Sequence, residues 1–291
     1  MLTAAGSWAT LGRGVLVRES RAYRMNSVLL LSSRHSVVVD PGVLPSELDE
    51  IAAKVAETKP RKLTLLFTHG HWDHVLGRSW WPEASTIAHL RLASEIAREA
   101  AKITREADTI ASSAGESWPR PFQPFDVDLG VGPGQTARLG SWVLAFLEGA
   151  GHSDTQIAIH VEPRKLLLAA DMLSDIEIPA LNGPAAVYRR TLEALRPLIA
   201  SGAVEHLVPG HGSPAKGAAA ILERLDRDLA YLEALESKVR EARRSKLSMG
   251  QALHALDAME YTGKTAEYSM VETHRHNVRH AWAGIEAETR A

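Results

Sequence analysis

The chain has 291 residues, 45% of them hydrophobic, and a formal net charge of −2. This composition allows a packed core, and it lacks the basic excess typical of nucleic-acid-binding domains. The sequence contains no cysteine, which excludes disulfides and thiolate metal ligands and leaves only oxygen and nitrogen ligands.

The amino-terminal segment and the apolar runs bear on where the protein works. Residues 1–14 contain Ser7, Thr10 and Arg13 and lack the unbroken apolar core of a signal peptide. The longest apolar runs, such as residues 166–170, are far too short to span a bilayer. We therefore expect a cytoplasmic protein with a small-molecule substrate and with neither membrane nor nucleic-acid partners.

Strand-like and helix-like patterns alternate in the first half of the chain. Apolar or β-branched runs predict strands at residues 14–17, 26–31, 36–39 and 63–67. Residues 45–54 place Leu48 and Ile51 on one face, which predicts a helix. A short strand at 86–88 and an exposed helix at 90–112 follow.

A stiff loop separates these elements from the second half. Residues 118–125 contain three prolines and three aromatic side chains and have no periodicity. After this loop, apolar runs predict strands at residues 141–147, 156–161, 166–170 and 205–208, and a helix at 184–199. This order suggests two sheets packed face to face with helices outside.

The carboxy-terminal part has a helical pattern. Leu225, Leu229 and Leu232 recur at spacings of three and four. We expect a catalytic domain over residues 1–213 and a helical extension over 214–291 packed on it, because no flexible linker precedes the extension. The same helices would also suit a homodimer interface.

Three histidines in the last helical stretch carry no clear metal motif. His274 shares a helix face with apolar residues, which favours a buried histidine with satisfied hydrogen bonds. His276 and His280 have the spacing of a metal-binding pair but lack a third ligand nearby in the sequence. We expect both to be surface residues.

The polar turn after the strand at 63–67 is the most informative feature of the sequence. Four potential metal ligands, His69, His71, Asp73 and His74, fall within six residues. A turn at the end of a strand allows such side chains to converge on one point. Neutral imidazole and carboxylate are ligands that divalent zinc, manganese and ferrous iron prefer.

Three further residues stand where a predicted strand passes into a loop. His152 lies between two strand-like runs, Asp171 follows the run at 166–170, and His211 follows the strand at 205–208. Catalytic groups are commonly found at such positions in layered α/β proteins.

These seven residues, in this order, resemble the ligand set of metallo-β-lactamase-fold hydrolases, in particular glyoxalase II and lactonase-like members. The resemblance implies an α/β fold, a four-layer αβ/βα sandwich with two metal ions at one edge between the sheets. One ion would be held by His69, His71 and His152. The other would be held by Asp73, His74 and His211, with Asp171 bridging both.

The resemblance also implies the chemistry. We expect a dinuclear metallohydrolase that cleaves a small ester, thioester or lactone with a metal-bridging hydroxide, while Asp73 accepts its proton. Zinc is the expected metal, and iron, manganese and cobalt suit the same ligands. Asp171 favours thioesterases, lactonases and phosphoester hydrolases, because β-lactamases of this superfamily generally carry Cys or Ser at that position.

Other functions fit part of the pattern. A phosphoester hydrolase is the nearest alternative, followed by a β-lactamase. A mononuclear iron dioxygenase acting on persulfides would use fewer of the ligands, and a non-catalytic binding module would not need them. The sequence does not identify the substrate.

Five further residues are candidates for supporting roles. Asp40 resembles the family's aspartate that orients a ligand histidine, and a turn residue is an equal alternative. Trp72 is a candidate for the wall of a substrate pocket, and burial under the adjacent helix is an equal alternative. Phe122 and Phe125 would form an apolar lid over the pocket or, more simply, anchor their own loop. Tyr188 would contact substrate or, more simply, lie on a helix surface.

Overall fold

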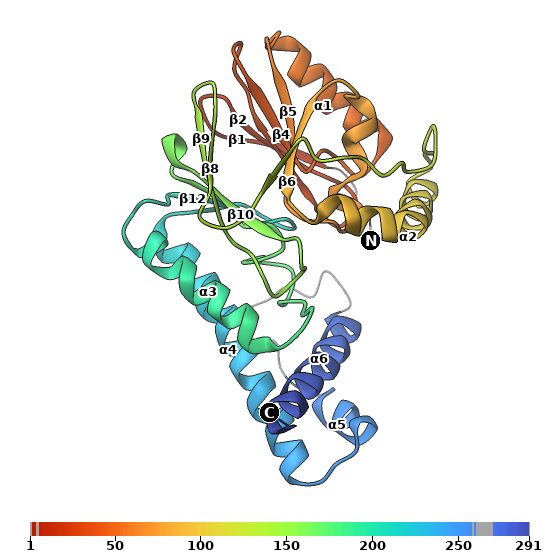
Figure 1. Cartoon of the computed structure of the whole chain (residues 1–291), viewed down its shortest axis with the longest axis vertical. Coiled ribbons are helices and arrows are strands. Elements are labelled where there is room, and N and C mark those ends of the chain that lie inside the picture. Colours follow the sequence, from red (N-terminus) through yellow and green to blue (C-terminus); the bar gives the residue numbers. More distant parts are fainter. Residues whose placement is uncertain (1, 4–5, 258, 260–269, 291) are drawn as a thin grey trace.

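The computed structural model describes residues 2–3, 6–257, 259 and 270–290. Two sheets lie face to face between two layers of helices, with further helices below them (Figure 1). The expected four-layer sandwich with a helical carboxy-terminal extension is therefore confirmed.

The first sheet has strands in chain order and changes from antiparallel to parallel pairing after β4. Its strands are β1 (Ser7–Gly12), β2 (Val15–Glu19), β3 (Asn26–Leu30), β4 (Ser36–Val39), β5 (Leu63–Phe67), β6 (Ser85–His89) and β7 (Leu129–Val131). Two helices, α1 (Pro45–Glu57) and α2 (Leu92–Ser113), cover its outer face, and the short helices η1 (Trp72–His74) and η2 (Leu76–Trp80) follow β5.

The second sheet is antiparallel except for the pair β11 and β12. Its strands are β8 (Thr136–Leu139), β9 (Trp142–Glu148), β10 (Ile157–Val161), β11 (Leu166–Leu168), β12 (His206–Val208) and β13 (Ala215–Lys216). A short helix, η3 (Glu162–Arg164), joins β10 to β11, and α3 (Ala185–Ala200) joins β11 to β12.

Alternating side chains of the strands build separate apolar layers. In β5, Leu66 packs in the layer between the two sheets, whereas Leu65 and Phe67 pack beneath α1 and α2. Both faces of the strand are therefore buried, as expected for a parallel strand covered on both sides.

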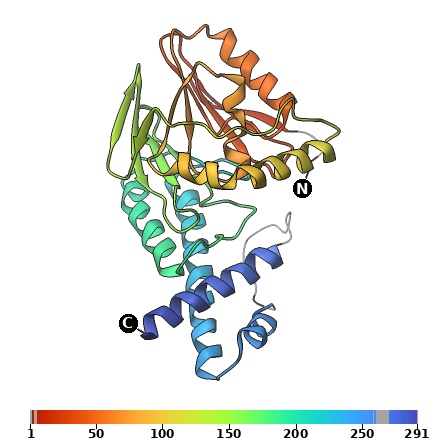
Figure 2. The same cartoon turned by 45° about the vertical axis from the view of Figure 1, so that its right-hand side comes forward.

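The carboxy-terminal helices belong to the same apolar core as the second sheet. They are α4 (Ala218–Arg244), α5 (Met249–Leu256) and α6 (Met270–Arg290). Leu167 of β11, Leu192 of α3, Leu232 of α4 and Val278 of α6 pack in one cluster. Figures 1 and 2 show α6 crossing α4 beneath the sandwich.

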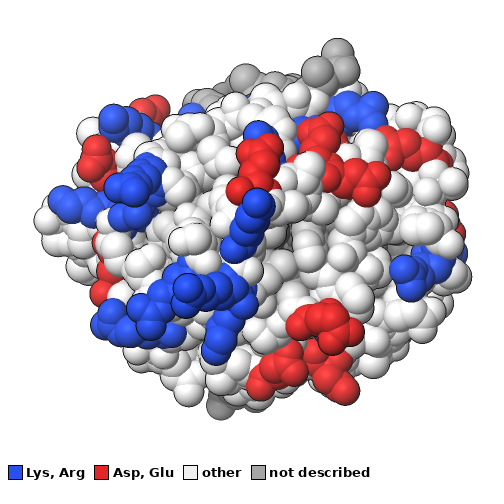
Figure 3. All heavy atoms as spheres, turned by 90° about the horizontal axis from the view of Figure 1, so that it is seen from above, with Lys and Arg blue, Asp and Glu red and all other residues white. Residues whose placement is uncertain are grey.

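The end of the sandwich away from α5 and α6 carries separated charges. The largest group of Lys and Arg lies on one side of this face, smaller groups lie elsewhere, and Asp and Glu form patches of their own (Figure 3). The total charge is near neutral, but positive and negative side chains form separate patches on this face. Among the helices that the structure describes, none is both long and apolar enough to cross a membrane.

Four short strands were not expected from local patterns: β1, β7, β8 and β13. The edge strand β1 is mostly exposed, and β13 has only two residues. Such strands form by pairing with a neighbour rather than through their own propensity.

We predict that Leu225→Ala lowers the free energy of unfolding by about 2–5 kcal/mol, because Leu225 is wholly buried in the core that joins α4 to the second sheet. Chemical denaturation should be followed by far-UV circular dichroism and by tryptophan fluorescence. All tryptophans but one precede residue 214, so fluorescence reports mainly on the sandwich. Coincident transitions are expected, and a separate early loss of helix would contradict a shared core.

Candidate metal centre

Strand ends bring seven donor side chains to one edge of the sandwich. The turn after β5 carries His69, His71, Asp73 and His74, and His152 comes from the loop between β9 and β10. The loops after β11 and β12 supply Asp171 and His211, respectively.

The donors form two groups. Within each group, one donor atom per residue lies within 4.8 Å of every other. The first group consists of His69, His71, His152 and Asp171. The second consists of Asp73, His74 and His211.

Asp171 lies between the two groups. Its Oδ2 atom is 3.1 Å from His152 Nε2 and 3.5 Å from His69 Nε2 on one side. On the other side, Oδ1 is 3.3 Å from His74 Nε2 and Oδ2 is 3.6 Å from His211 Nε2. A single carboxylate is therefore within reach of both groups.

The backbone around Asp171 is shaped for this close approach. Ala170, directly before it, has a positive φ of 49°, a conformation that residues other than glycine seldom adopt. Gly210 lies against the carboxylate, since a Cβ atom on this glycine would stand 2.0 Å from Asp171 Oδ1. A larger residue before His211 would displace the carboxylate.

Each of four histidines has its outer nitrogen, Nδ1, occupied by a partner. Nδ1 of His152 donates to Ala180 O at 3.2 Å and Nδ1 of His211 donates to Tyr23 O at 2.9 Å, because a carbonyl can only accept. Nδ1 of His74 donates to Asp40 Oδ2 at 2.9 Å. These bonds leave Nε2 directed at the centre, as in metal-binding histidines.

His69 follows the same rule through a hydroxyl group. Thr68 Oγ1 donates to Asp40 Oδ2 at 2.6 Å, so it accepts from His69 Nδ1 at 3.0 Å. Asp40, with a positive φ of 45°, thus supports two histidines and also accepts from the Thr68 amide at 2.8 Å. Asp40, the candidate for orienting a ligand histidine, is thus hydrogen-bonded to His74.

Two donor atoms at the centre form no hydrogen bond with any residue that the structure describes, although each lies near other donors. His69 Nε2 and Asp171 Oδ1 are buried without a hydrogen bond. Buried polar atoms are nearly always hydrogen-bonded, so orphaned atoms that converge with other donors need a separate explanation. A cation between them would satisfy both, and the residues present therefore fit a divalent metal.

Charge within the centre is divided unequally between the two groups. Burial, assisted by the nearby His74, lowers the pKa of His69 to about 4. Burial also lowers the pKa of His211, but Glu177 and Asp171 outweigh it and raise that pKa to about 10. Without metal, His211 in the second group therefore holds a proton, and its positive charge stabilises the nearby carboxylates.

A hollow of about 620 Å³ opens beside the centre, a volume that suits a small molecule. His71, Asp73 and His152 line it together with Trp72, whose ring packs edge-on against Tyr23. Polar residues of α2 contribute Glu95, Arg98, Glu99, Lys102 and Glu106.

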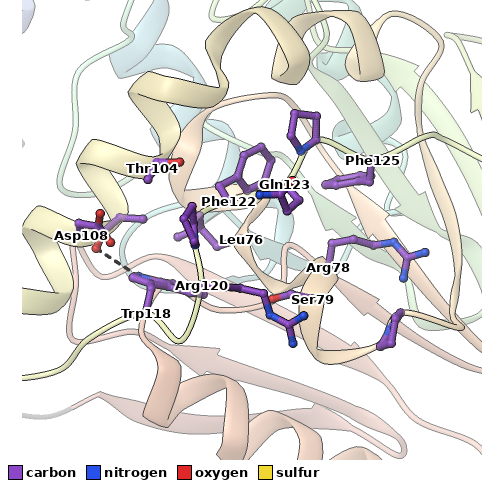
Figure 4. A pocket seen from close by; sticks show the side chains of 14 residues that line it. Leu76, Arg78, Ser79, Thr104, Asp108, Trp118, Arg120, Phe122, Gln123 and Phe125 are labelled. Carbon is purple, nitrogen blue, oxygen red and sulfur yellow. Dashed lines mark hydrogen bonds between the residues drawn. The ribbon is translucent and has the colours of Figure 1, made fainter.

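Three residues expected in the pocket wall lie elsewhere. Tyr188 is wholly buried in the core of the second sheet, and its hydroxyl donates to Asp171 O at 2.9 Å. It therefore lies behind Asp171 and does not line the hollow. Phe122 and Phe125 line a second hollow of about 240 Å³, between η2 and α2 (Figure 4). Phe125 packs there against Phe67 of β5, with ring centroids 4.8 Å apart.

Sequence patterns missed several residues near the centre. Thr155 accepts from the Gly70 amide at 3.0 Å and donates to Glu95, which ties the ligand turn to α2. His276 of α6 is exposed as expected, yet it lies on the wall of the hollow. His274 is buried, with both ring nitrogens hydrogen-bonded, as its helix face predicts.

We predict that Asp171→Ser weakens metal binding by more than about tenfold, because a hydroxyl brings no charge to a position shared by both groups. Zinc titration of chelator-treated protein measures the affinity. The thermal melting curve of the metal-free variant serves as the folding control. A variant that binds zinc as tightly as the parent would show that Asp171 does not act as a bridge.

We predict that the two groups differ in proton release. The pKa of about 10 for His211 and of about 4 for His69 means that the group containing His211 must lose more protons as metal binds. Its affinity should rise as the pH is raised from about 6 to about 8. Calorimetric titration in two buffers of different ionisation enthalpy counts the protons. Equal release for both ions would contradict the assignment.

Known proteins match this architecture. The metallo-beta-lactamase superfamily model matches residues 22–212. The acyl-coenzyme A thioesterase MBLAC2 of Bos taurus and that of Homo sapiens are each 27% identical over 225 residues, covering 69% of this chain and 79% of theirs.

Solved structures show the same fold at low sequence identity. The inverting sec-alkylsulfatase Pisa1 from Pseudomonas sp. has a TM-score of 0.71 at 13% identity, covering 95% of this chain. The match spans only 50% of the sulfatase chain. A metallo-beta-lactamase from Hirschia baltica has a TM-score of 0.51 at 19% identity, covering 78% of this chain and 97% of that one.

The family match and the thioesterase relative together indicate a metal-dependent hydrolase. The matched residues begin before the ligand turn and end just after His211, so they enclose all seven donors. The chain belongs to the metallo-beta-lactamase superfamily.

Proposed function

We propose that this chain is a dinuclear metal-dependent hydrolase of small acyl esters, with an acyl thioester as the favoured substrate. The observation that carries the proposal is the position of the Asp171 carboxylate, within 3.6 Å of nitrogen donors from both groups. A mononuclear site would not need a carboxylate shared between two sets of donors.

The donor groups divide the ligands between two ions. His69, His71 and His152 would hold one, and Asp73, His74 and His211 would hold the other, with Asp171 in contact with both. The imidazole and carboxylate donors suit zinc. When bound, such ions would supply a nucleophile from water at neutral pH and would polarise the scissile carbonyl.

The residues of the chain position the reaction and handle its protons. Asp73 Oδ2 lies 3.3 Å from His211 Nε2, and these two neighbours are both in the second group. Burial raises the pKa of Asp73, but His74 and His211 outweigh this effect and keep the carboxyl group ionised. The ionised carboxylate would serve as an acceptor for a proton of the attacking water, and because its lowered pKa makes it a weak base, it would pass this proton on quickly.

The thioesterase relative supports a thioester substrate. The chemistry of the thiolate leaving group supports the same choice. A thiol has a pKa of about 8.5, so a thiolate departs readily without prior protonation. The hollow has room for a small acyl group beside His71 and His152. An ester or lactone would need the same attack but a more basic leaving oxygen.

We predict that the zinc-loaded protein hydrolyses acyl-coenzyme A faster than other substrate classes. The panel should include a lactone, an aryl ester, a phosphodiester and a chromogenic β-lactam, each measured as kcat/KM. Chelator-treated protein provides the control and should be inactive on every substrate, and Asp171→Ser should hydrolyse the thioester more slowly than the parent at limiting zinc. Faster turnover of the phosphodiester would reject the thioester assignment in favour of a phosphoester hydrolase.

A further inference from the structure

The carboxy-terminal helix α6 is hydrogen-bonded to the loop that follows Asp171. Asn277, wholly buried on this helix, donates Nδ2–H to Pro179 O at 2.6 Å. Its Oδ1 atom accepts from the Leu181 amide at 2.8 Å. One side chain thus binds the backbone on both sides of Ala180.

Ala180 is the residue that orients a ligand histidine. Its carbonyl oxygen accepts from His152 Nδ1 at 3.2 Å, which fixes the tautomer of the ring. Nε2 of His152 then lies 3.0 Å from His71 Nδ1 and 3.1 Å from Asp171 Oδ2. The position of the Ala180 carbonyl therefore decides where this donor points.

The Asn277 amide is itself held in one orientation. Tyr231 of α4 donates its hydroxyl proton to His274 Nδ1 at 3.0 Å, because His274 Nε2 already donates to Leu256 O at 3.0 Å. The Tyr231 oxygen in turn accepts from Asn277 Nδ2 at 2.8 Å. Both amide protons and the amide oxygen of Asn277 are used, so its geometry is well defined.

Other contacts tie the same loop at its far end. His276 Nε2 donates to Leu181 O at 2.8 Å, and His280 Nδ1 accepts from the Gly183 amide at 3.0 Å. The Asn182 amide donates to Gly151 O at 2.7 Å, directly before His152. The segment has no helix or strand of its own between β11 and α3, so side chains from α6 set its path.

We propose that Asn277 is a positioning residue for His152 and that α6 is thereby part of the metal centre. The inference rests on the proposed dinuclear function. Asn277 touches neither the donors nor the hollow, and it acts through Pro179, Ala180 and Leu181. Removing its amide would let the Ala180 carbonyl shift and the His152 ring turn. Groups that hydrogen-bond directly to metal ligands, as Ala180 does to His152, typically alter metal affinity by about 10–100-fold when changed, and Asn277 acts one step further out, at the lower end of that range.

The test is cobalt titration of chelator-treated Asn277→Leu, a substitution of similar size that removes all three hydrogen bonds. We expect about tenfold weaker binding of the ion held by His69, His71 and His152, with altered d–d absorption bands. Val278→Ala is the matched control, because Val278 is wholly buried on the same helix but contacts apolar residues. It should lower the melting temperature and leave cobalt affinity unchanged.

A double-mutant cycle separates positioning from general destabilisation. In a His152→Ala background, Asn277→Leu should cause no further loss of cobalt affinity, since its route to the metal has been removed. An equal loss in both backgrounds would overturn the inference. If Asn277→Leu does not fold, Asn277→Ser permits the same cycle.

The outcomes for parent and variant are distinguishable. A parent protein that binds fewer than two cobalt equivalents would count against the proposed dinuclear function. A parent that binds two, together with an Asn277 variant of unchanged affinity, would overturn the positioning role alone.

Discussion

The structure depends on the convergence of five imidazoles and two carboxylates, most of them buried, at one edge of the sandwich. Such a cluster is costly without compensating charge, because each group loses hydration and many lie beside groups of the same kind. The pKa shifts show the conflict, with His69 forced neutral and His211 forced to hold a proton. Metal ions would replace these protons and supply the positive charge that the carboxylates require.

The fold meets this constraint with an outer layer of hydrogen bonds from distant segments. Asp40 comes from the end of β4, Tyr23 from the turn between β2 and β3, and Ala180 from the loop after β11. Each binds the outer nitrogen of one ring directly, and Asp40 also supports His69 through Thr68. The centre therefore joins both sheets, and a change in any of these segments is transmitted to a donor.

The helical extension is joined to the sandwich in two ways. Its apolar face shares one core with the second sheet, and its polar side chains fix the loop that carries Ala180. His276 of the same helix lies on the wall of the hollow. This arrangement makes α6 a candidate route by which the carboxy-terminal part influences both metal binding and substrate contact.

The sequence by itself determined what depends on local order. The turn from His69 to His74 concentrates four donors in six residues, and the periods of two and about 3.6 marked most strands and helices. The tertiary structure decided what depends on chain segments meeting. Tyr188 and Phe125 are aromatic, as pocket residues often are. In the folded chain, however, Tyr188 lies behind Asp171 and Phe125 packs against Phe67. Asn277 carries no local signal, because its role exists only once α6 folds back onto a loop almost a hundred residues earlier, 96 positions from Leu181.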